Sequence, residues 1–360
     1  MSTDRQDFEG LVTEARRQVE ICNACRYCEG YCSVFPAITR ERQFAEGNLT
    51  QLANLCHNCR GCYYACQYTE PHEFALNLPR ALAELRTASW AGFAWPSSFG
   101  RLFQRSGLAL AVLLALGLAV VIFALQTLRP ESGEGFYAFL SHGVMVAIFM
   151  PAFLLPLLAI TIGIQRYWQA VGGQTVRLGH IKTAFAEAAR LKDLSGGQGQ
   201  GCNYEKTDRF SNARRHAHQA TMWGFLLCFA STVSATLMHY LADWPAPYTL
   251  LSPPKLLGLP GGFLLVIGTL GLFALKLKAD KALGATAVFA GEMGFVLLLG
   301  ITGASGLLLY AATGTALVPP LLALHLGAVL AFFLTTPYSK MAHGFYRLAA
   351  LVRDAQTRST

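Results

Sequence analysis

The first seventy residues carry one cysteine pattern twice, and cysteine thiolates at this spacing can bind iron–sulfur clusters. The two copies are Cys22-x2-Cys25-x2-Cys28-x3-Cys32 and Cys56-x2-Cys59-x2-Cys62-x3-Cys66, which use eight of the ten cysteines. Two complete runs of this kind are typical of proteins that hold two [4Fe–4S] clusters. We therefore predict two such clusters in this chain.

The spacing also predicts which cysteines share a cluster. Three thiolates on one tight turn bind three irons of one cube, whereas the fourth, three residues further along, usually binds the other cluster. The expected ligand sets are therefore crossed. They are Cys22, Cys25, Cys28 and Cys66 for one cluster, and Cys56, Cys59, Cys62 and Cys32 for the other.

Zinc and disulfide bonds are the alternative uses of these cysteines. Zinc sites usually pair two C-x2-C units at a distance, rather than four cysteines within eleven residues. Disulfides need an oxidising compartment, and we expect none because no cleavable signal peptide precedes Cys22. The proline that often follows the fourth cysteine is replaced by Ser33 and Gln67, which argues against a small β-type ferredoxin.

The segment between the two cysteine runs favours a helical module instead. Phe44, Leu49, Leu52 and Leu55 are spaced for one face of a helix over 40–55, which Gly47 would interrupt. We therefore expect a mainly helical ferredoxin-like module rather than a β-type one.

The rest of the chain has the composition of a membrane protein. The 360 residues are 53% hydrophobic and 14% charged, whereas soluble proteins carry about 25% charged residues. We predict a soluble module over 1–105, a membrane domain over 106–345 and a tail over 346–360. Runs of about 20 apolar residues can cross a bilayer, and we expect them at 107–128, 138–165, 217–240, 259–277, 285–311 and 317–338. The predicted fold is mainly α, with the two-cluster module followed by a six-helix transmembrane bundle.

The basic residues predict the orientation of the spans. They concentrate in segment 166–215, in the loop 276–281 and after residue 339, whereas only Arg129 and Lys255 lie on the opposite side. Cytoplasmic loops are enriched in Lys and Arg, so we expect the cluster module to face the cytoplasm and the spans to lie in the bacterial inner membrane. The net charge of +8 comes from these loops and does not indicate a nucleic-acid partner.

Five histidines lie in or at the ends of the predicted spans, where polar side chains are costly and usually functional. They are His142, His218, His239, His325 and His343. His325 and His343 are 18 residues apart, so on one helix they would share a face and stand about 27 Å apart along its axis. Histidines so placed can be the axial ligands of haem, although each alone could simply cap a helix end or contact headgroups.

We expect one or two haem b groups from these histidines. The cytoplasmic pair would be His343 with His218, or with His216 in its place. The pair on the opposite side would be His325 with either His142 or His239.

Four longer segments are distinctive. They read CNACRYCEGYCSVFPA, LANLCHNCRGCYYACQYTEPHEFALNLP, RRHAHQATMWGFLLCFASTVSATLMHY and HLGAVLAFFLTTPYSKMAHGFYRL. They resemble the family of tricarballylate-utilisation protein B, or CitB-type proteins, over nearly the whole chain. The resemblance implies a membrane iron–sulfur protein that reoxidises the reduced flavin of a partner tricarballylate dehydrogenase and passes electrons to the quinone pool.

The last segment also resembles the final helix of the nitrate-reductase gamma-type cytochrome b. This resemblance implies that His325 and His343 serve two different haems. The segment FLSHGVMVAIF is similar to the other ligand helix of that cytochrome, with His142 matching its first histidine. Its second histidine would fall near Ala152, so His218 would have to substitute for it.

These features favour a quinone-reducing electron-transfer subunit that serves a flavoprotein dehydrogenase. No dinucleotide-binding G-x-G-x-x-G, P-loop or nucleophile elbow occurs, so substrate chemistry is expected in the partner. The alternative is a heterodisulfide-reductase-like membrane oxidoreductase subunit, for which only Cys202 and Cys228 are left over. Two cluster motifs argue against a transporter or scaffold.

Several residues keep two interpretations at this stage. Glu292 would serve as a proton path to quinone or as a partner of a nearby polar group. Arg26 and Arg60, beside the cysteine turns, would contact the partner or tune the cluster potentials. Residues 177–193 form an amphipathic pattern that suits either the membrane surface or the cluster module. Cys202, after the glycine-rich segment 195–201, has no assigned role.

Overall fold

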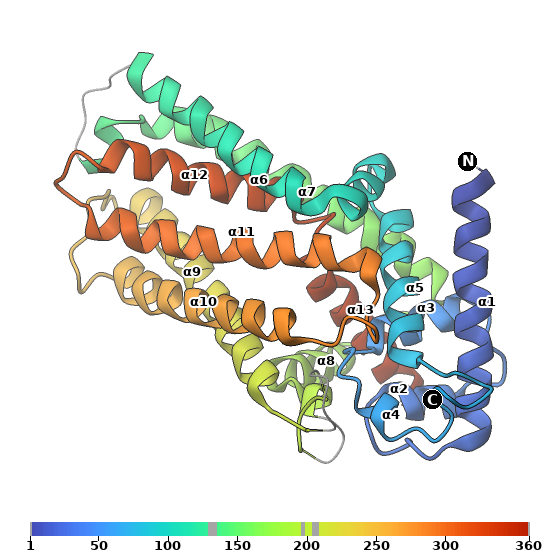
Figure 1. Ribbon diagram of the computed structural model, residues 1–360. Helices are drawn as coiled ribbons and strands as arrows, with labels where there is room; N and C mark the ends of the chain where they lie inside the picture. Colours follow the sequence, from blue (N-terminus) through green and yellow to red (C-terminus); the bar gives the residue numbers. More distant parts are fainter. Residues whose placement is uncertain (1, 129–134, 196–198, 204–208, 359–360) are drawn as a thin grey trace.

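The computed structural model describes residues 2–128, 135–195, 199–203 and 209–358, and helices dominate it (Figure 1). Within these ranges the strand-like pairing is an isolated bridge between Cys202 and Ser211. An N-terminal group of helices lies at one end of a bundle of long helices, as Figure 1 shows. The prediction of a mainly α fold is confirmed. Arg129 and the glycines at 196 and 197 lie outside the described residues.

The N-terminal group packs around an apolar core. Its helices are α1 (Ser2–Cys25), α2 (Val34–Arg40), α3 (Glu46–Leu55), α4 (Gly61–Tyr64) and α5 (Leu78–Phe93). Buried residues at helical spacing, such as Val12, Ala15 and Val19 on α1, face this core. The Asn77 side chain accepts a hydrogen bond from the backbone N–H of Arg80 at 3.2 Å and so caps the start of α5.

The predicted helix over 40–55 is shorter than expected. Helix α3 begins at Glu46, although Phe44 before it is still buried in the core. Gly47 does not interrupt the helix. A Cβ atom at Gly47 would lie 2.2 Å from the carbonyl oxygen of Ala170, so the glycine allows α3 to approach the end of a long helix closely.

Among the described residues, six helices are long and apolar enough to cross a membrane, as predicted. They are α6 (Ser97–Leu128), α7 (His142–Ala170), α9 (Ala213–Leu241), α10 (Pro253–Lys278), α11 (Thr286–Ala311) and α12 (Val318–Thr335). A short 3₁₀ helix, η1 (Gly135–Ala138), precedes α7. Helix α6 leaves the N-terminal group and bends at Ser106, where φ is −134° and ψ is 26°.

Helices α9 and α10 pack most closely, because small residues face each other. A Cβ atom at Gly224 would lie 2.4 Å from the backbone nitrogen of Leu265. Close backbone approach through glycine is the usual packing device of membrane helices. Cys228 sits in this contact, beside Gly261.

The prediction that His325 and His343 share one helix is wrong. Helix α12 ends at Thr335, and α13 (Ala342–Arg358) begins after a turn that contains Pro337. Proline has no N–H group to continue the helical hydrogen bonds, and its ring clashes with the preceding turn.

Helix α13 packs back into the core of the N-terminal group. Tyr346, Ala350 and Leu351 are at most 4% exposed there. Residues 346–358 are therefore part of a packed helix rather than a separate tail.

Helix α8 (Leu178–Arg190) lies against α13, followed by the 3₁₀ helix η2 (Lys192–Ser195). Ala184 is fully buried in the core that α13 shares with the N-terminal group. Phe185 and Leu178 face outward, 56% and 65% exposed. The amphipathic segment therefore packs on the cluster module through its small residues and leaves two large apolar side chains uncovered.

Candidate metal centres

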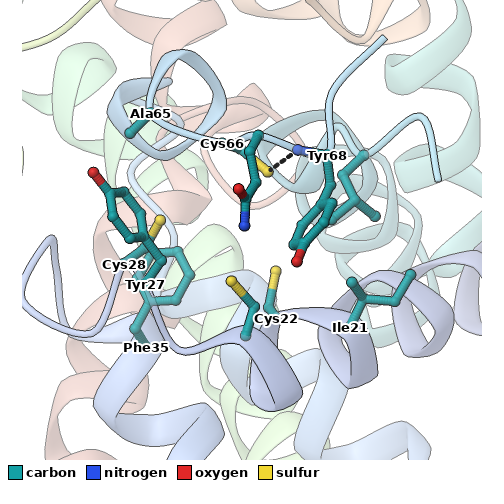
Figure 2. A pocket seen from close by; sticks show the side chains of 11 residues that line it. Ile21, Cys22, Tyr27, Cys28, Phe35, Ala65, Cys66 and Tyr68 are labelled. Carbon is teal, nitrogen blue, oxygen red and sulfur yellow. Dashed lines mark hydrogen bonds between the residues drawn. The ribbon is translucent and has the colours of Figure 1, made fainter. Parts of the chain in front are cut away.

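The structure gathers one predicted cysteine set around a cavity of about 210 Å³, which we call the first site. Its cysteines are Cys22, Cys25, Cys28 and Cys66, the crossed set expected from the spacing. Cys22 and Cys25 lie in the last turn of α1, and Cys66 arrives from the second motif, beyond α4 (Figure 2). The backbone N–H of Tyr68 donates to the sulfur of Cys66 at 3.4 Å.

The other four cysteines form a second site. They are Cys32, Cys56, Cys59 and Cys62. Burial raises the pKa of Cys32 and of Cys62, and the neighbouring Cys56 and Cys59 raise both further. Cys32 thus lies among the cysteines of the other motif, again as the spacing predicts.

The two sites differ in exposure. At the first site Cys25 is exposed and Tyr27, in the same turn, is 69% exposed. At the second site Cys56 is buried, and Leu191, Leu194 and Cys202 pack against the half-buried Cys59. The first site is therefore the more exposed of the two.

The donors suit a polynuclear cluster. Burial, with the neighbouring cysteines, raises the pKa of Cys22 and of Cys28 to about 12. Such thiols become thiolates only when cations, such as the irons of a cluster, replace their protons. In the described part of the chain, no three His, Cys, Asp or Glu side chains converge tightly enough for a single metal ion. The first site instead surrounds a cavity.

Arginines that the sequence did not single out surround the second site. Arg86, 5% exposed on α5, donates to the carbonyl of Cys56 at 2.6 Å. Arg347, from α13, donates to the same carbonyl at 3.3 Å and to that of Leu55. Within the described ranges, the buried Nε–H groups of Arg86 and Arg347 have no hydrogen-bond partner. Burying a guanidinium costs several kcal/mol unless negative charge compensates it, so both arginines fit an anionic cluster held by thiolates.

Cys202 also belongs to the second site. Its thiol is 2% exposed, donates to the carbonyl of Leu194 at 3.6 Å and packs against Cys59. The next residue, Asn203, donates its backbone N–H to the carbonyl of Cys59 at 3.1 Å. Arg214, at the start of α9, donates to the carbonyl of Asn58 at 2.7 Å. The sequence offered no signal for these contacts, because the segment between α8 and α9 is far from the motif along the chain.

The histidines form two pairs at opposite ends of the bundle. At the end near the cysteines, the rings of His218 and His343 lie 5.9 Å apart between centroids, as predicted for this pair. At the other end, the rings of His142 and His239 stack at 4.3 Å. His325 instead has Ser305 as its partner, with 3.1 Å between its Nδ1 and the hydroxyl oxygen.

This arrangement differs from the expected outer pair. Among the described ring contacts, none joins His325 to His142 or His239. Among the described residues, the buried Nδ1 atoms of His218 and His239, one in each histidine pair, have no hydrogen-bond partner. Such nitrogens are available to bind iron, and the contact of His142 with His239 makes this pair the candidate at the outer end in place of one that includes His325.

Glu292 has a different environment from the histidines. Its carboxylate lies between the ammonium groups of Lys276, on α10, and Lys340, before α13, and it accepts a hydrogen bond from each. Glu292 therefore interacts with nearby charged groups, which is one of the two roles that the sequence left open for it.

Comparison with known proteins decides the family. A model of citrate utilization protein B matches residues 100–360, and one of its Fer4-like domain matches residues 15–92. The chain belongs to the citrate utilization protein B family. It is 43% identical over 349 residues to citrate utilization protein B of Escherichia coli, covering 95% of this chain and 91% of that protein. No solved structure matches the chain.

Family membership confirms the resemblance found in the sequence. The Fer4-like domain covers all eight motif cysteines, between residues 15 and 92. The helices apolar enough to cross a membrane lie in the part that matches the citrate utilization protein B model. A Fer4-like domain joined to such helices fits a membrane iron–sulfur protein of electron transfer.

Proposed function

We propose that this chain carries electrons from the reduced flavin of a partner dehydrogenase, through two [4Fe–4S] clusters and haem b, to quinone in the bacterial inner membrane. The placement of the two cysteine sites is the observation that carries the proposal. The first site has an exposed cysteine turn, whereas the turn of the second site packs against the start of α9 and the end of α10. Clusters and haem supply one-electron transfer when bound.

The residues have separate tasks in this proposal. The crossed cysteine sets would hold the two clusters, and the exposed turn with Cys25 and Tyr27 would receive the partner. His218 with His343, and His142 with His239, would be the axial ligands of two haems. The basic loops at the cysteine end support a cytoplasmic position for the module.

The partner would be a flavoprotein dehydrogenase that oxidises a tricarboxylate. The relative's name refers to citrate, and the resemblance in the sequence refers to tricarballylate, which is also a tricarboxylate. We propose tricarballylate as the partner's substrate. The heterodisulfide alternative finds no support, since Cys202 contacts Cys59 whereas Cys228 lies near the middle of α9.

Purified full-length protein in lipid tests the proposal. Reduced partner flavoprotein and a quinone analogue are added, and quinol is measured by absorbance. We expect quinol to form with the wild type, and not with a Cys59→Ser variant. Reoxidation of the flavin without quinol, with several benzoquinones and naphthoquinones tried, would contradict the assignment.

A further inference from the structure

A second cavity of about 210 Å³ lies where the turn between α10 and α11 meets the second cysteine turn. We propose that this junction cavity binds the headgroup of the quinone; the inference rests on the proposed function and gives it a site. Three parts of the chain line the cavity. They are Asn58 and Arg60 beside Cys59, Ala83 on α5, and residues of α10, α11 and their turn, including Lys276, Lys281, Phe289 and Glu292.

The polar side of the junction cavity is built from buried charged groups. Arg60 is 3% exposed and donates to the carbonyl of Asp280 at 2.8 Å. Lys276 is 9% exposed and donates to Glu292, which Lys340 also contacts from outside the cavity lining. Quinone carbonyl oxygens accept hydrogen bonds, and buried ammonium and guanidinium groups are strong donors for them.

The other side of the cavity is apolar and suits one ring. Ala83, Val288 and Phe289 line it, and the ammonium of Lys276 lies 5.1 Å from the centre of the Phe289 ring. An apolar cavity of about 150 Å³ in another protein holds benzene. A volume of about 210 Å³ is therefore enough for a substituted single ring.

The junction cavity also lies beside a surface that would face lipid. Leu277 and Leu270, on the outer side of α10, are 53% and 62% exposed. Leu277 directly follows Lys276, which lines the cavity. An isoprenoid tail could thus leave the cavity along α10 and enter the bilayer, where its apolar carbons are stable.

The position beside Cys59 suits the redox chemistry. Reduction of a quinone takes two electrons and two protons, and both C=O groups become C–OH groups. The electrons would arrive singly, from the second-site cluster or from the haem that His218 and His343 would hold beside it, and the donor would be oxidised by one electron each time. The protons would leave Lys276 and its ion-pair network, and water from the cytoplasmic side would restore them. Asn58 and Arg60 line the cavity and directly precede and follow Cys59 in the sequence. A quinone ring in the cavity would therefore lie beside this cluster ligand.

An anionic phospholipid headgroup is the competing occupant of a basic cavity at a membrane interface. Two cations of the junction cavity are already engaged, Lys276 by Glu292 and Arg60 by the Asp280 carbonyl. The third, Lys281, is exposed and lies 5.6 Å from the centre of the Phe289 ring. The acidic Glu292 and Asp280 also line the cavity and would oppose a phosphate. The lining therefore favours a neutral ligand that accepts hydrogen bonds.

Photolabelling of the full-length protein in lipid tests the site independently of turnover. The probe is an azido-benzoquinone, and the labelled peptides are identified by mass spectrometry. We expect label within 276–293 or 58–60, displaced by excess decyl-benzoquinone. Lys276→Met should reduce labelling and raise the quinone KM, each about tenfold, with unchanged cluster signals in electron paramagnetic resonance. Lys278→Met, two residues along the same helix and exposed, should change neither.

A second variant covers the case in which Lys276→Met fails to assemble. Phe289→Leu keeps an apolar wall but removes the aromatic ring, and it should weaken labelling while the clusters remain. Label elsewhere, with quinol still formed by the wild type, would overturn the junction cavity but leave the proposed function intact. Label displaced by phosphatidylglycerol vesicles and not by quinone would also overturn it. Absence of quinol with every quinone would instead reject the proposed function.

Discussion

Arg26 and Arg60 share the left-handed backbone conformation, with φ of 54° and 63°, at the residue that follows the second cysteine of each motif. Their side chains have opposite environments. Arg26 is exposed and donates to the carbonyl of Asn23, whereas Arg60 is 3% exposed and donates to the carbonyl of Asp280. The two turns are local repeats, but only Arg26 can contact a partner protein. Of the two interpretations of Arg60, the structure favours an influence on the cluster potential, because the α10–α11 turn covers this residue.

Arg26 is expected to contribute to partner docking. Reversal of its charge in Arg26→Glu should raise the KM for the flavoprotein by roughly threefold to tenfold at low salt, and less at high salt. Cluster potentials should stay unchanged. Arg42→Glu, an exposed arginine outside both cysteine turns, is the control. Equal effects of the two variants would contradict a specific docking role.

The crossed ligand sets predict which cluster each fourth cysteine affects. Cys66→Ser should damage the cluster of the first site, although Cys66 belongs to the second motif. Cys32→Ser should damage the cluster of the second site. Electron paramagnetic resonance of each variant, with iron and sulfide analysis, separates the two signals. The reverse pattern would contradict crossed ligation, and zinc in place of iron and sulfide in the wild type would exclude clusters altogether.

Arg86 is expected to raise the reduction potential of the cluster at the second site. Its buried positive charge stabilises the more negative, reduced cluster. Loss of one charge at about 10 Å corresponds to roughly 1–2 kcal/mol at an effective dielectric constant of about 20. Arg86→Gln should therefore lower the potential by about 60 mV for one electron. Redox titration measures this change.

Two variants control the Arg86 experiment. Arg86→Lys should leave the reduction potential of the second-site cluster close to the wild-type value, because lysine keeps the positive charge. Arg80→Gln, on the solvent side of α5, should leave it unaltered. If Arg86→Gln lowered only the reduction potential of the first-site cluster, Arg86 would act on that cluster, which would contradict our proposal.

Cys202 is expected to stabilise the reduced state through its thiol. Hydrogen bonds to cluster sulfurs raise reduction potentials. The thiol of Cys202 packs against Cys59 and donates to the carbonyl of Leu194 at 3.6 Å, and we expect it to turn to the sulfur of Cys59 when that sulfur is a cluster thiolate. Cys202→Ala should lower the second-site potential, whereas Cys202→Ser, which keeps a donor, should lower it less. Cys228→Ala is the matched control, because Cys228 lies among the long helices. If Cys202→Ala removes the cluster itself, the residue would be a ligand rather than a hydrogen-bond donor.

The histidine pairs predict separate losses of haem. His343→Ala should remove the haem near the cysteines, and His142→Ala the one at the opposite end, each about half of the total. His325→Ala should leave both, since His325 contacts Ser305. The pyridine haemochrome assay counts the haem, and optical spectra separate the two species. A wild type without haem would show that these histidines have another role.

Local patterns in the sequence determined the cysteine motifs, the helical class and the six apolar helices. Each of these depends on neighbours along the chain: thiols at fixed spacing on a turn, or apolar residues in a continuous run. The fourth cysteine of each motif was also assigned from spacing, and the structure gathers the same residues, although ligation itself stays a prediction. The break before α13 lies at Pro337, and the 18-residue spacing of His325 and His343 did not predict it.

Only the tertiary structure decided which distant residues meet. Arg347 contacts the carbonyls of Leu55 and Cys56 because α13 folds back into the N-terminal core. His142 meets His239 because α7 begins where α9 ends, at one end of the bundle. Such contacts follow from the packing of whole helices against each other, which buries apolar surface in the N-terminal group and brings small residues together among the long helices. No periodicity within one segment encodes that result, so the surroundings of the cysteine sites became visible only in three dimensions.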